Sequence, residues 1–250
     1  MTLANRAQKR PFSIDHQIGD VRDRLDQHLR WWLGGPPLPG PGALNVTPAR
    51  NEPGWDGKVR PIQGVTGPEG SVLAVAPGVA PLLEGSTAAE VFADAAAPDG
   101  HERLSRRFGM PAGYGMPVFR WSKEAADGPD VGEWIDPEDP RLPDWLRPFN
   151  GGVLALFEDD QYVAGVGLKR HNDLAFELSV GTDPDFRGQG YATDLVAQAA
   201  REIIAAGGVP LYQHGPDNEA SARVADAAGF PDRGWFMLEI HPATTGTIRG

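Results

Sequence analysis

Alternating apolar and polar positions are most regular in the second half of the chain. In residues 174–180 every second side chain is apolar, a period that predicts a β-strand. The apolar-rich runs 152–158 and 161–170 lie on either side of the turn residues Asp159 and Asp160, and they predict two more strands. Because short turns join the three strands, we expect a meander that leads into the segment after residue 180.

After residue 190 the spacing of the apolar positions changes from two to three or four. This spacing continues to Gly207 and Gly208, which predicts an amphipathic helix that ends there. A short apolar strand is predicted at 209–214, and Asn218 stands where the N-cap of a last helix is expected. Gly229 suits the C-terminal end of that helix, and a final strand is predicted at 235–241.

The first half of the chain has a weaker pattern. Ser13 is placed to cap a helix that runs to about Trp32, and residues 34–57 are rich in proline and glycine, which predicts an extended connection without regular elements. The remaining predicted elements are a hairpin formed by 59–65 and 71–76, a helix at 87–97 and a strand at 116–121.

The turn before the helix at 190 has the composition of an anion site. Gly188 and Gly190 lack a Cβ, so an anion can approach the backbone N–H groups at the positive end of the helix, and Arg187 adds a cation. A dinucleotide fingerprint needs a third glycine where Thr193 stands, and no Gly-Lys pair of a Walker loop is present. A diphosphate therefore fits the turn, although glycines before a helix also serve plain turn geometry.

The pattern Arg187-x-x-Gly190-x-Ala192, followed by Asn218-x-x-Ser221 and Gly229-Phe230, resembles the GCN5-related N-acetyltransferase (GNAT) superfamily. The resemblance covers roughly residues 151–240. It implies an α/β protein of the α+β type, with a mixed, largely antiparallel sheet flanked by helices. It also implies acetyl-coenzyme A as co-substrate, with its pyrophosphate on the N–H groups of 187–192 and its pantetheine arm along the strand at 174–182. The residues that it assigns to this ligand are Leu178, Val180, Arg187, Gly188, Gln189, Gly190, Tyr191, Ala192, Asn218 and Ser221.

The activity that the resemblance implies is attack of an amine on the thioester. A primary amine is mostly protonated at neutral pH, so a proton acceptor is needed. Glu177 lies on the predicted strand, on the face opposite Leu178 and Val180, and is the candidate general base, with a pKa that partial burial is expected to raise. The alternative is an outward-facing carboxylate without a role in catalysis.

The acid for the leaving thiolate departs from the family pattern. Many members carry a tyrosine four residues before the glycine at 229, where this chain has Ala225. Tyr212 and His214, which share one face of the strand at 209–214, are the candidates for this role, as is bulk water. The chain has no cysteine, so an acyl-enzyme on a thiolate is excluded and direct transfer in a ternary complex is expected. A serine ester is the alternative that stays open, although no Gly-x-Ser-x-Gly elbow is present.

Composition limits the partners. The chain has 250 residues, of which 40% are hydrophobic and 23% are charged, as in an ordinary globular protein. No run approaches the roughly 20 apolar residues of a membrane span, no signal peptide is recognised, and a cytoplasmic location is expected. The formal net charge of -11 argues against nucleic acid and favours a small cationic amine. The histidines show no metal-ligand spacing, so no metal is expected.

An acidic stretch at 127–144 surrounds Trp134, and we interpret it as a solvated loop or as a mouth that attracts an amine. We predict a supporting region at 1–125, with a degenerate GNAT-like module as one interpretation, and an acetyl-coenzyme A-binding catalytic domain at 126–250. A homodimer is compatible with the sequence. Two functions stay open: an N-acetyltransferase for a small amine, and an acyl-coenzyme A sensor or scaffold without turnover.

Overall fold

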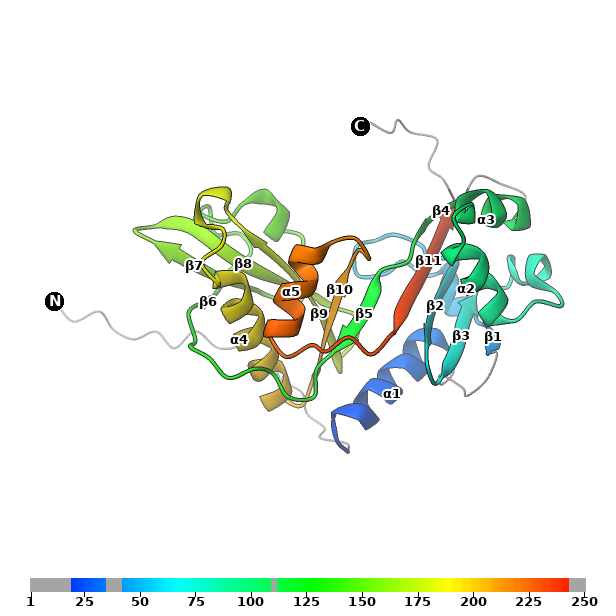
Figure 1. Ribbon diagram of the computed structural model, residues 1–250, viewed down its shortest axis with the longest axis horizontal. Helices are drawn as coiled ribbons and strands as arrows, with labels where there is room; N and C mark the ends of the chain where they lie inside the picture. Colours follow the sequence, from blue (N-terminus) through cyan, green and yellow to red (C-terminus); the bar gives the residue numbers. More distant parts are fainter. Residues whose placement is uncertain (1–18, 35–41, 109–111, 243–250) are drawn as a thin grey trace. The chain divides into compact units, whose positions relative to one another are not determined.

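The computed structural model describes residues 19–34, 42–108 and 112–242. The described residues form two compact units (Figure 1). The first contains 19–25, 120–213 and 218–231, and the second contains the remaining described residues. Each unit is therefore built from segments that are far apart in the sequence. The predicted division of the chain at residue 125 stays a prediction.

The first unit has a mixed sheet in the order β10-β9-β8-β7-β6 (Figure 1). Neighbouring strands are antiparallel except β9 and β10, which are parallel. Asp159 and Asp160 adopt left-handed backbone angles, with φ of 46° and 64°, in the turn between β7 and β8. The five strands are β6 (Glu133–Ile135), β7 (Val153–Glu158), β8 (Gln161–Arg170), β9 (Ala175–Thr182) and β10 (Val209–His214).

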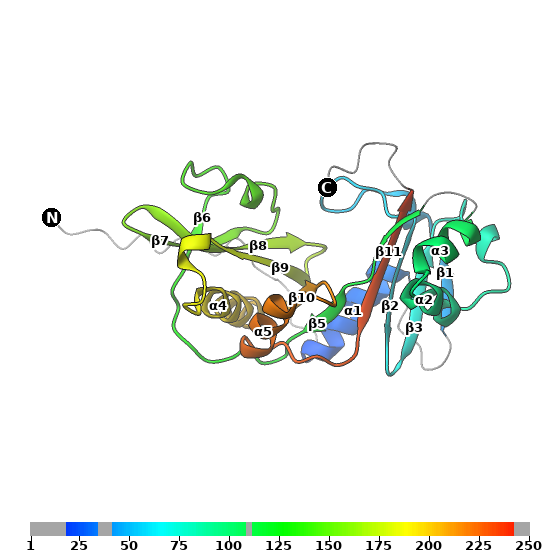
Figure 2. The same cartoon turned by 45° about the horizontal axis from the view of Figure 1, so that its top comes forward.

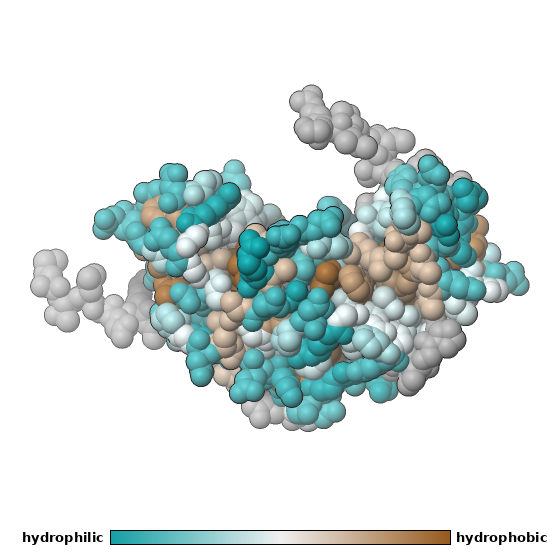
Figure 3. Space-filling view, in the orientation of Figure 1, coloured by the Kyte–Doolittle hydropathy of each residue, from teal (hydrophilic) through white to brown (hydrophobic). Residues whose placement is uncertain are grey.

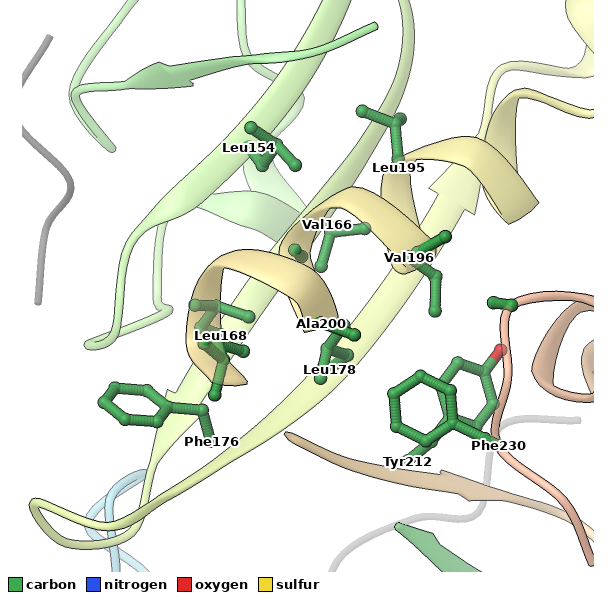
Figure 4. Close-up of a cluster of buried hydrophobic side chains, with 14 of the residues drawn as sticks. Leu154, Val166, Leu168, Phe176, Leu178, Leu195, Val196, Ala200, Tyr212 and Phe230 are labelled. Carbon is green, nitrogen blue, oxygen red and sulfur yellow. The ribbon is translucent and has the colours of Figure 1, made fainter. Parts of the chain in front are cut away.

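Helices α4 (Tyr191–Ala205) and α5 (Glu219–Ala227) cover one face of this sheet (Figures 1 and 2). The apolar face of α4 packs on the alternate strand positions that point toward it, and Figure 4 shows Val196 and Ala200 beside Val166 and Leu178. Full burial of one valine or leucine side chain stabilises the folded protein by roughly 1.5–3 kcal/mol. The apolar side chains that led to the predictions of the strands and of this helix therefore pack together in one core.

The outer side of α5 faces solvent. Glu219, Arg223 and Asp226 are exposed on this helix, while Ala225 is fully buried in the core. Figure 3 shows the visible surface of α5 as mostly hydrophilic. The burial of Ala225 leaves no room for a large side chain to be added there without rearrangement of the core.

The opposite face of the sheet is covered by the segment that contains the 3-10 turn Asp144–Leu146, which lies above β7, β8 and β9 in Figure 2. Glycines on that face make space for it. A Cβ on Gly167 would come within 2.1 Å of the Phe149 ring, and a Cβ on Gly181 would come within 2.7 Å of the Trp145 ring. The two glycines therefore set how closely this segment can approach the strands.

The second unit also contains a sheet that is covered by helices. Strands β2 (Ile62–Gly67) and β3 (Gly70–Val75) form an antiparallel hairpin, β1 (Ala43–Val46) runs parallel to β3, and β11 (Phe236–Pro242) is antiparallel to β2. Strands β4 (Ala112–Gly115) and β5 (Val118–Trp121) pair with β11. Helices α2 (Ala88–Ala96) and α3 (Gly100–Phe108) pack on this sheet through the core that contains Leu73, Val91, Leu104 and Leu238.

Most of the predicted elements are confirmed, as is the mixed, largely antiparallel sheet flanked by helices. The hairpin and α2 lie where the sequence placed them, and Thr87 begins α2 with a capping box to Glu90. Helix α1 (Val21–Leu33) confirms the later part of the predicted first helix, whereas Ser13 lies outside the described residues. The prediction that 34–57 has no regular element is wrong, because β1 finds a parallel partner in β3, which is distant in sequence.

Candidate functional site

The turn between β9 and α4 is exposed and depends on two glycines. Gly188 and Gly190 have φ of 78° and 89°, in the left-handed region that favours glycine. A Cβ placed on either residue would meet nothing within 4 Å, so both glycines border open space. The turn therefore needs glycine for its backbone angles and is reachable by a ligand.

The first amides of α4 are not capped by a side chain. Gly190 is the N-cap residue and makes no side-chain cap hydrogen bond, while the amides of Thr193 and Asp194 both donate to its carbonyl oxygen, over 2.9 and 3.1 Å. Among the residues that the structure describes, the amides of 188–192 donate to no protein acceptor. Uncapped N–H groups at the positive end of a helix form an anion-binding site.

The side chains of the turn are arranged around these amides. Arg187 is exposed, and its Nε donates to the carbonyl oxygen of Thr182 over 3.4 Å. The Tyr191 hydroxyl donates to the Glu158 carboxylate over 2.8 Å, and this hydrogen bond raises the pKa of Tyr191. Because the Tyr191 hydroxyl is hydrogen-bonded to Glu158, we expect Tyr191 to contact an anion through its main-chain N–H.

Strands β9 and β10 separate in the middle of β9. Their parallel register runs from Val209 and Ala175 to Tyr212 and Leu178 and then ends. Residues 179–182 of β9 continue in register with β8 alone. The edge that turns away from β8 thus offers N–H and C=O groups to an extended ligand beside the anion site.

Leu178 and Val180 point into the core on the α4 side of β9, where Leu178 is buried and Val180 is partly buried. Their side chains pack against the protein. A ligand that follows β9 would therefore meet these residues through their main-chain groups. Both assignments stay predictions, now limited to the backbone.

Glu177 lies on the other face of β9, as predicted from the alternation, and is only 4% exposed. Its carboxylate accepts from the Gln213 amide over 2.8 Å, lies 3.1 Å from His171 Nε2 and forms an ion pair with Lys169. The alternative of an outward-facing carboxylate is therefore wrong.

The pKa that the sequence led us to expect for Glu177 is also wrong in direction. Burial raises this pKa, but the hydrogen bond from His171 and the charge of Lys169 oppose burial and outweigh it, so that the pKa of Glu177 is lowered from 4.5 to about 2. Glu177 is an ionised hydrogen-bond acceptor at neutral pH. A carboxylate of this kind holds its neighbours in place more readily than it takes up a proton.

Tyr212 extends from β10 toward α5. Its ring is 1% exposed and packs on Phe230, with ring centroids 5.6 Å apart, and its hydroxyl lies 2.8 Å from Ser221 Oγ. Burial raises the pKa of Tyr212, against opposing contributions from Ser221 and Arg120, so the phenol stays protonated at neutral pH. Tyr212 thus brings a hydroxyl group to the same helix that carries Ala225.

Asn218 and Ser221 have structural partners of their own. The Asn218 side chain accepts from the Ser221 amide over 3.0 Å and caps α5, as the sequence predicted for Asn218. Ser221 Oγ is engaged by Tyr212. Their assignment to the ligand stays a prediction, and both contribute to the position of α5.

His214 is the last residue of β10 and is grouped with the second unit. It is 6% exposed, and its Nδ1 lies 2.8 Å from the carbonyl oxygen of Gly215. Its assignment to proton transfer stays a prediction.

Several side chains of the acidic stretch at 127–144 have partners within the protein. Asp139 pairs with Arg141, and this hydrogen bond lowers the pKa of Asp139, while Asp130 pairs with Arg201 over 2.5 Å. Trp134 is buried and donates to Glu202 over 2.9 Å. Within the described ranges, no group of three potential metal ligands is present.

The sequence interpretation missed three partners of Glu177, namely Lys169, His171 and Gln213. A polar side chain inside a predicted strand is a weak signal, and Lys169 and Gln213 carry it. Their convergence depends on the register, in which Lys169 faces Glu177 across β8 and β9. The exact register between two strands cannot be derived from residue types alone.

The region that contains this site matches a known protein family. Residues 117–230 match the model described as the acetyltransferase (GNAT) family. A mycothiol acetyltransferase from Nocardiopsis dassonvillei is 32% identical over 103 residues, which is 40% of this chain and 30% of that protein. The chain thus matches less than a third of that relative's length.

Two solved structures give further comparisons. A putative acetyltransferase of the GNAT family from Novosphingobium aromaticivorans is 19% identical, with 72% of this chain and 86% of that chain covered and a TM-score of 0.42. A putative acetyltransferase from Salmonella typhimurium with its cofactor acetyl-CoA is 17% identical, with 39% and 67% covered and a TM-score of 0.29.

Proposed function

Residues 117–230 belong to the acetyltransferase (GNAT) family, and from this premise we propose that the protein transfers an acetyl group from acetyl-coenzyme A to a primary amine of a small molecule. The observation that carries the proposal is the uncapped start of α4 beside the separation of β9 and β10. These features match the two parts of the ligand, a diphosphate and an extended amide-bearing arm.

The residues present fit acetyl-coenzyme A. The amides of 188–192 and the Arg187 guanidinium would hold the pyrophosphate, since both are exposed and the glycines leave the approach open. The main chain of 179–182 would hold the pantetheine arm. When bound, the ligand supplies an acetyl group already activated as a thioester.

The two proton transfers of the reaction are assigned to side chains on opposite faces of strands β9 and β10. In this proposal the cluster around Glu177 assists removal of the proton from the amine, and the Tyr212 hydroxyl, which contacts Ser221 Oγ, gives a proton to the leaving thiolate. Tyr212 would then replace the tyrosine that many family members carry at the position of Ala225. Transfer is direct, in a complex that holds both substrates.

The acceptor that we propose is cationic. The net charge of -11 gives the protein a negative field, which raises the local concentration of a positively charged amine.

The relative from Nocardiopsis dassonvillei is named for acetyl transfer related to mycothiol, and this name supports acetyl transfer by the present chain.

A thiol-release assay tests the proposal. The purified protein is incubated with acetyl-coenzyme A and one of spermidine, glucosamine or kanamycin, and the free thiol is measured while mass spectrometry identifies the acetylated amine. The protein contributes no background thiol because it has no cysteine. Turnover on at least one amine is expected. Tight binding of acetyl-coenzyme A without thiol release on any amine would instead favour a sensor or scaffold.

The anion site has a separate test. Arg187→Ala removes a charge-assisted contact, so we expect the affinity for acetyl-coenzyme A, measured by isothermal titration, to fall by about tenfold or more. Arg30→Ala, at an exposed position of α1, is the control for loss of a positive charge and should bind as the wild type does. Equal affinities of the Arg187 variant and the control would mean that Arg187 only shapes the turn.

A further inference from the structure

A buried polar cluster joins three strands of the first unit on the face of the sheet opposite α4. Lys169 of β8, Glu177 of β9 and Gln213 of β10 contribute to it, together with His171 from the connection between β8 and β9. The His171 and Glu177 side chains are 10% and 6% exposed. The Glu177 carboxylate is the common partner of the other three residues.

In this cluster one residue can hold the others in position while a different residue takes up a proton. A base works best when its pKa lies near the operating pH, and the partners of Glu177 hold its pKa at about 2. Histidine is the side chain that ordinarily gains and loses a proton between pH 5 and 8. His171 is therefore the member of the cluster that is chemically suited to take up a proton.

The contact between the two side chains also defines which histidine nitrogen is basic. His171 Nε2 lies 3.1 Å from Glu177 Oε2. When Nε2 carries the hydrogen and donates to this carboxylate, Nδ1 is the nitrogen that accepts a proton. The carboxylate thus fixes the tautomer and the orientation of the ring.

The cluster lies where the two parallel strands separate. Glu177 directly precedes Leu178, whose pairing with Tyr212 is the last between β9 and β10. Under the proposed function the thioester end of the pantetheine arm would follow β9 toward this point. Arg170 and Asp173, the charged neighbours of His171 in sequence, pair with each other at the surface, whereas Lys169 and Glu177 are charged members of the cluster.

We propose that His171 is the general base for the acceptor amine and that Glu177 is its positioning residue. The inference rests on the proposed function and deepens it. The amine nitrogen forms a bond to the acetyl carbon, the C–S bond breaks, the amine proton passes to His171 Nδ1, and the thiolate leaves and takes a proton from Tyr212 or water. The products are the acetylated amine and the free thiol.

The first test compares two histidine substitutions. His171→Gln should lower kcat by the roughly 10²- to 10⁴-fold that follows loss of a general base, with acetyl-coenzyme A affinity kept. His101→Gln, at an exposed position of α3, is the matched control and should turn over at the wild-type rate. Wild-type kcat in the His171 variant would overturn the proposal and leave the proposed transferase intact.

The second test removes the charge of Glu177 or of Lys169, each in its own variant, and uses the amine that gives the fastest thiol release. Glu177→Gln removes the charge that favours protonated imidazole, so the acidic limb of the pH profile of kcat/KM should move to lower pH by roughly one unit. Lys169→Gln removes a cation and should move the limb to higher pH. Opposite shifts in the two variants would not arise from a purely structural role.

Nuclear magnetic resonance titration of the His171 ring in the wild type and in Glu177→Gln gives a readout that is independent of turnover. A lower titration midpoint in the variant supports the coupling, and identical midpoints overturn the positioning role of Glu177. If Glu177→Gln abolishes turnover while His171→Gln leaves the acidic limb in place, Glu177 itself is the base. Wild-type protein that acetylates no amine would remove both the base role and the proposed function.

Discussion

At the residue scale, Glu177 shows how packing changes the chemistry of a side chain whose position the sequence already indicates. The alternation along 174–180 places it opposite the core face of β9. Lys169 and His171 then lower its pKa although burial alone would raise it. A carboxylate predicted as a proton acceptor is in this way converted into a permanent anion at neutral pH.

The lowered pKa predicts how acid affects stability. A carboxylate whose pKa falls from 4.5 to about 2 on folding stabilises the protein above pH 4.5, and this contribution is lost as the pH falls toward 2. The contribution is on the order of 3 kcal/mol at most. The difference in free energy of unfolding between the wild type and Glu177→Gln, from urea titrations, should therefore be largest above pH 5 and should narrow toward pH 2.5.

Glu102→Gln, at an exposed position of α3, is the control for removal of a carboxylate and should follow the wild type across the same range. A difference between the wild type and Glu177→Gln that does not change with pH would contradict the ion pairs around Glu177.

At the scale of elements, α5 illustrates a helix that is held at its start by one side chain. Asn218 caps the helix by accepting from the Ser221 amide, and Ser221 Oγ in turn contacts the Tyr212 hydroxyl. The cap and the proposed acid are thus connected through one residue. The start of α4 differs, because Gly190 caps it without a side chain and leaves its amides available for an anion.

Loss of the α5 cap has a predictable size. Asn218→Ala should lower the free energy of unfolding by about 1 kcal/mol, since the Ser221 amide loses its acceptor. Asn218→Ser, which keeps a capping oxygen, should restore most of this loss. The measurement is urea-induced unfolding followed by circular dichroism, and equal stability of the wild type and the alanine variant would show that the cap is replaced by solvent.

At the scale of the whole molecule, charge distinguishes the classes of partner. The net charge of -11 opposes binding to polyanions and favours cationic amines. In the part of the chain that has been described, none of the helices combines the length and the apolar character that crossing a bilayer requires. Asp130 and Asp139 of the acidic stretch form ion pairs within the protein, so part of the attraction of an amine is expected from the overall field.

Long-range attraction predicts a dependence on salt. Between 20 and 300 mM NaCl, kcat/KM for spermidine should fall several-fold because added ions screen its multiple charges. Glucosamine carries one positive charge and should lose much less. Initial rates of thiol release measure both, and equal salt dependence of the two amines would mean that the charge of the protein does not select the acceptor.

Features that depend on neighbouring residues along the chain could be predicted from the sequence. Two-residue and helical periods located β7, β8, β9 and α4, glycines marked the turn at 187–190, and Asn218 marked the start of α5. Each of these follows from local geometry, in which the side-chain direction and the backbone angles are set within a few residues.

Features that depend on how strands pair could be seen only in the folded chain. The parallel strand β1 and the separation of β9 from β10 after Leu178 involve segments far apart in sequence. Lys169 and His171 are close to Glu177 in sequence, and they meet it, together with Gln213 of β10, because the β8–β9 register and the β9–β10 pairing bring these side chains together. The direction of the Glu177 pKa shift depends on those neighbours, because burial and nearby cations act on a carboxylate with opposite sign and only the folded chain determines which is larger.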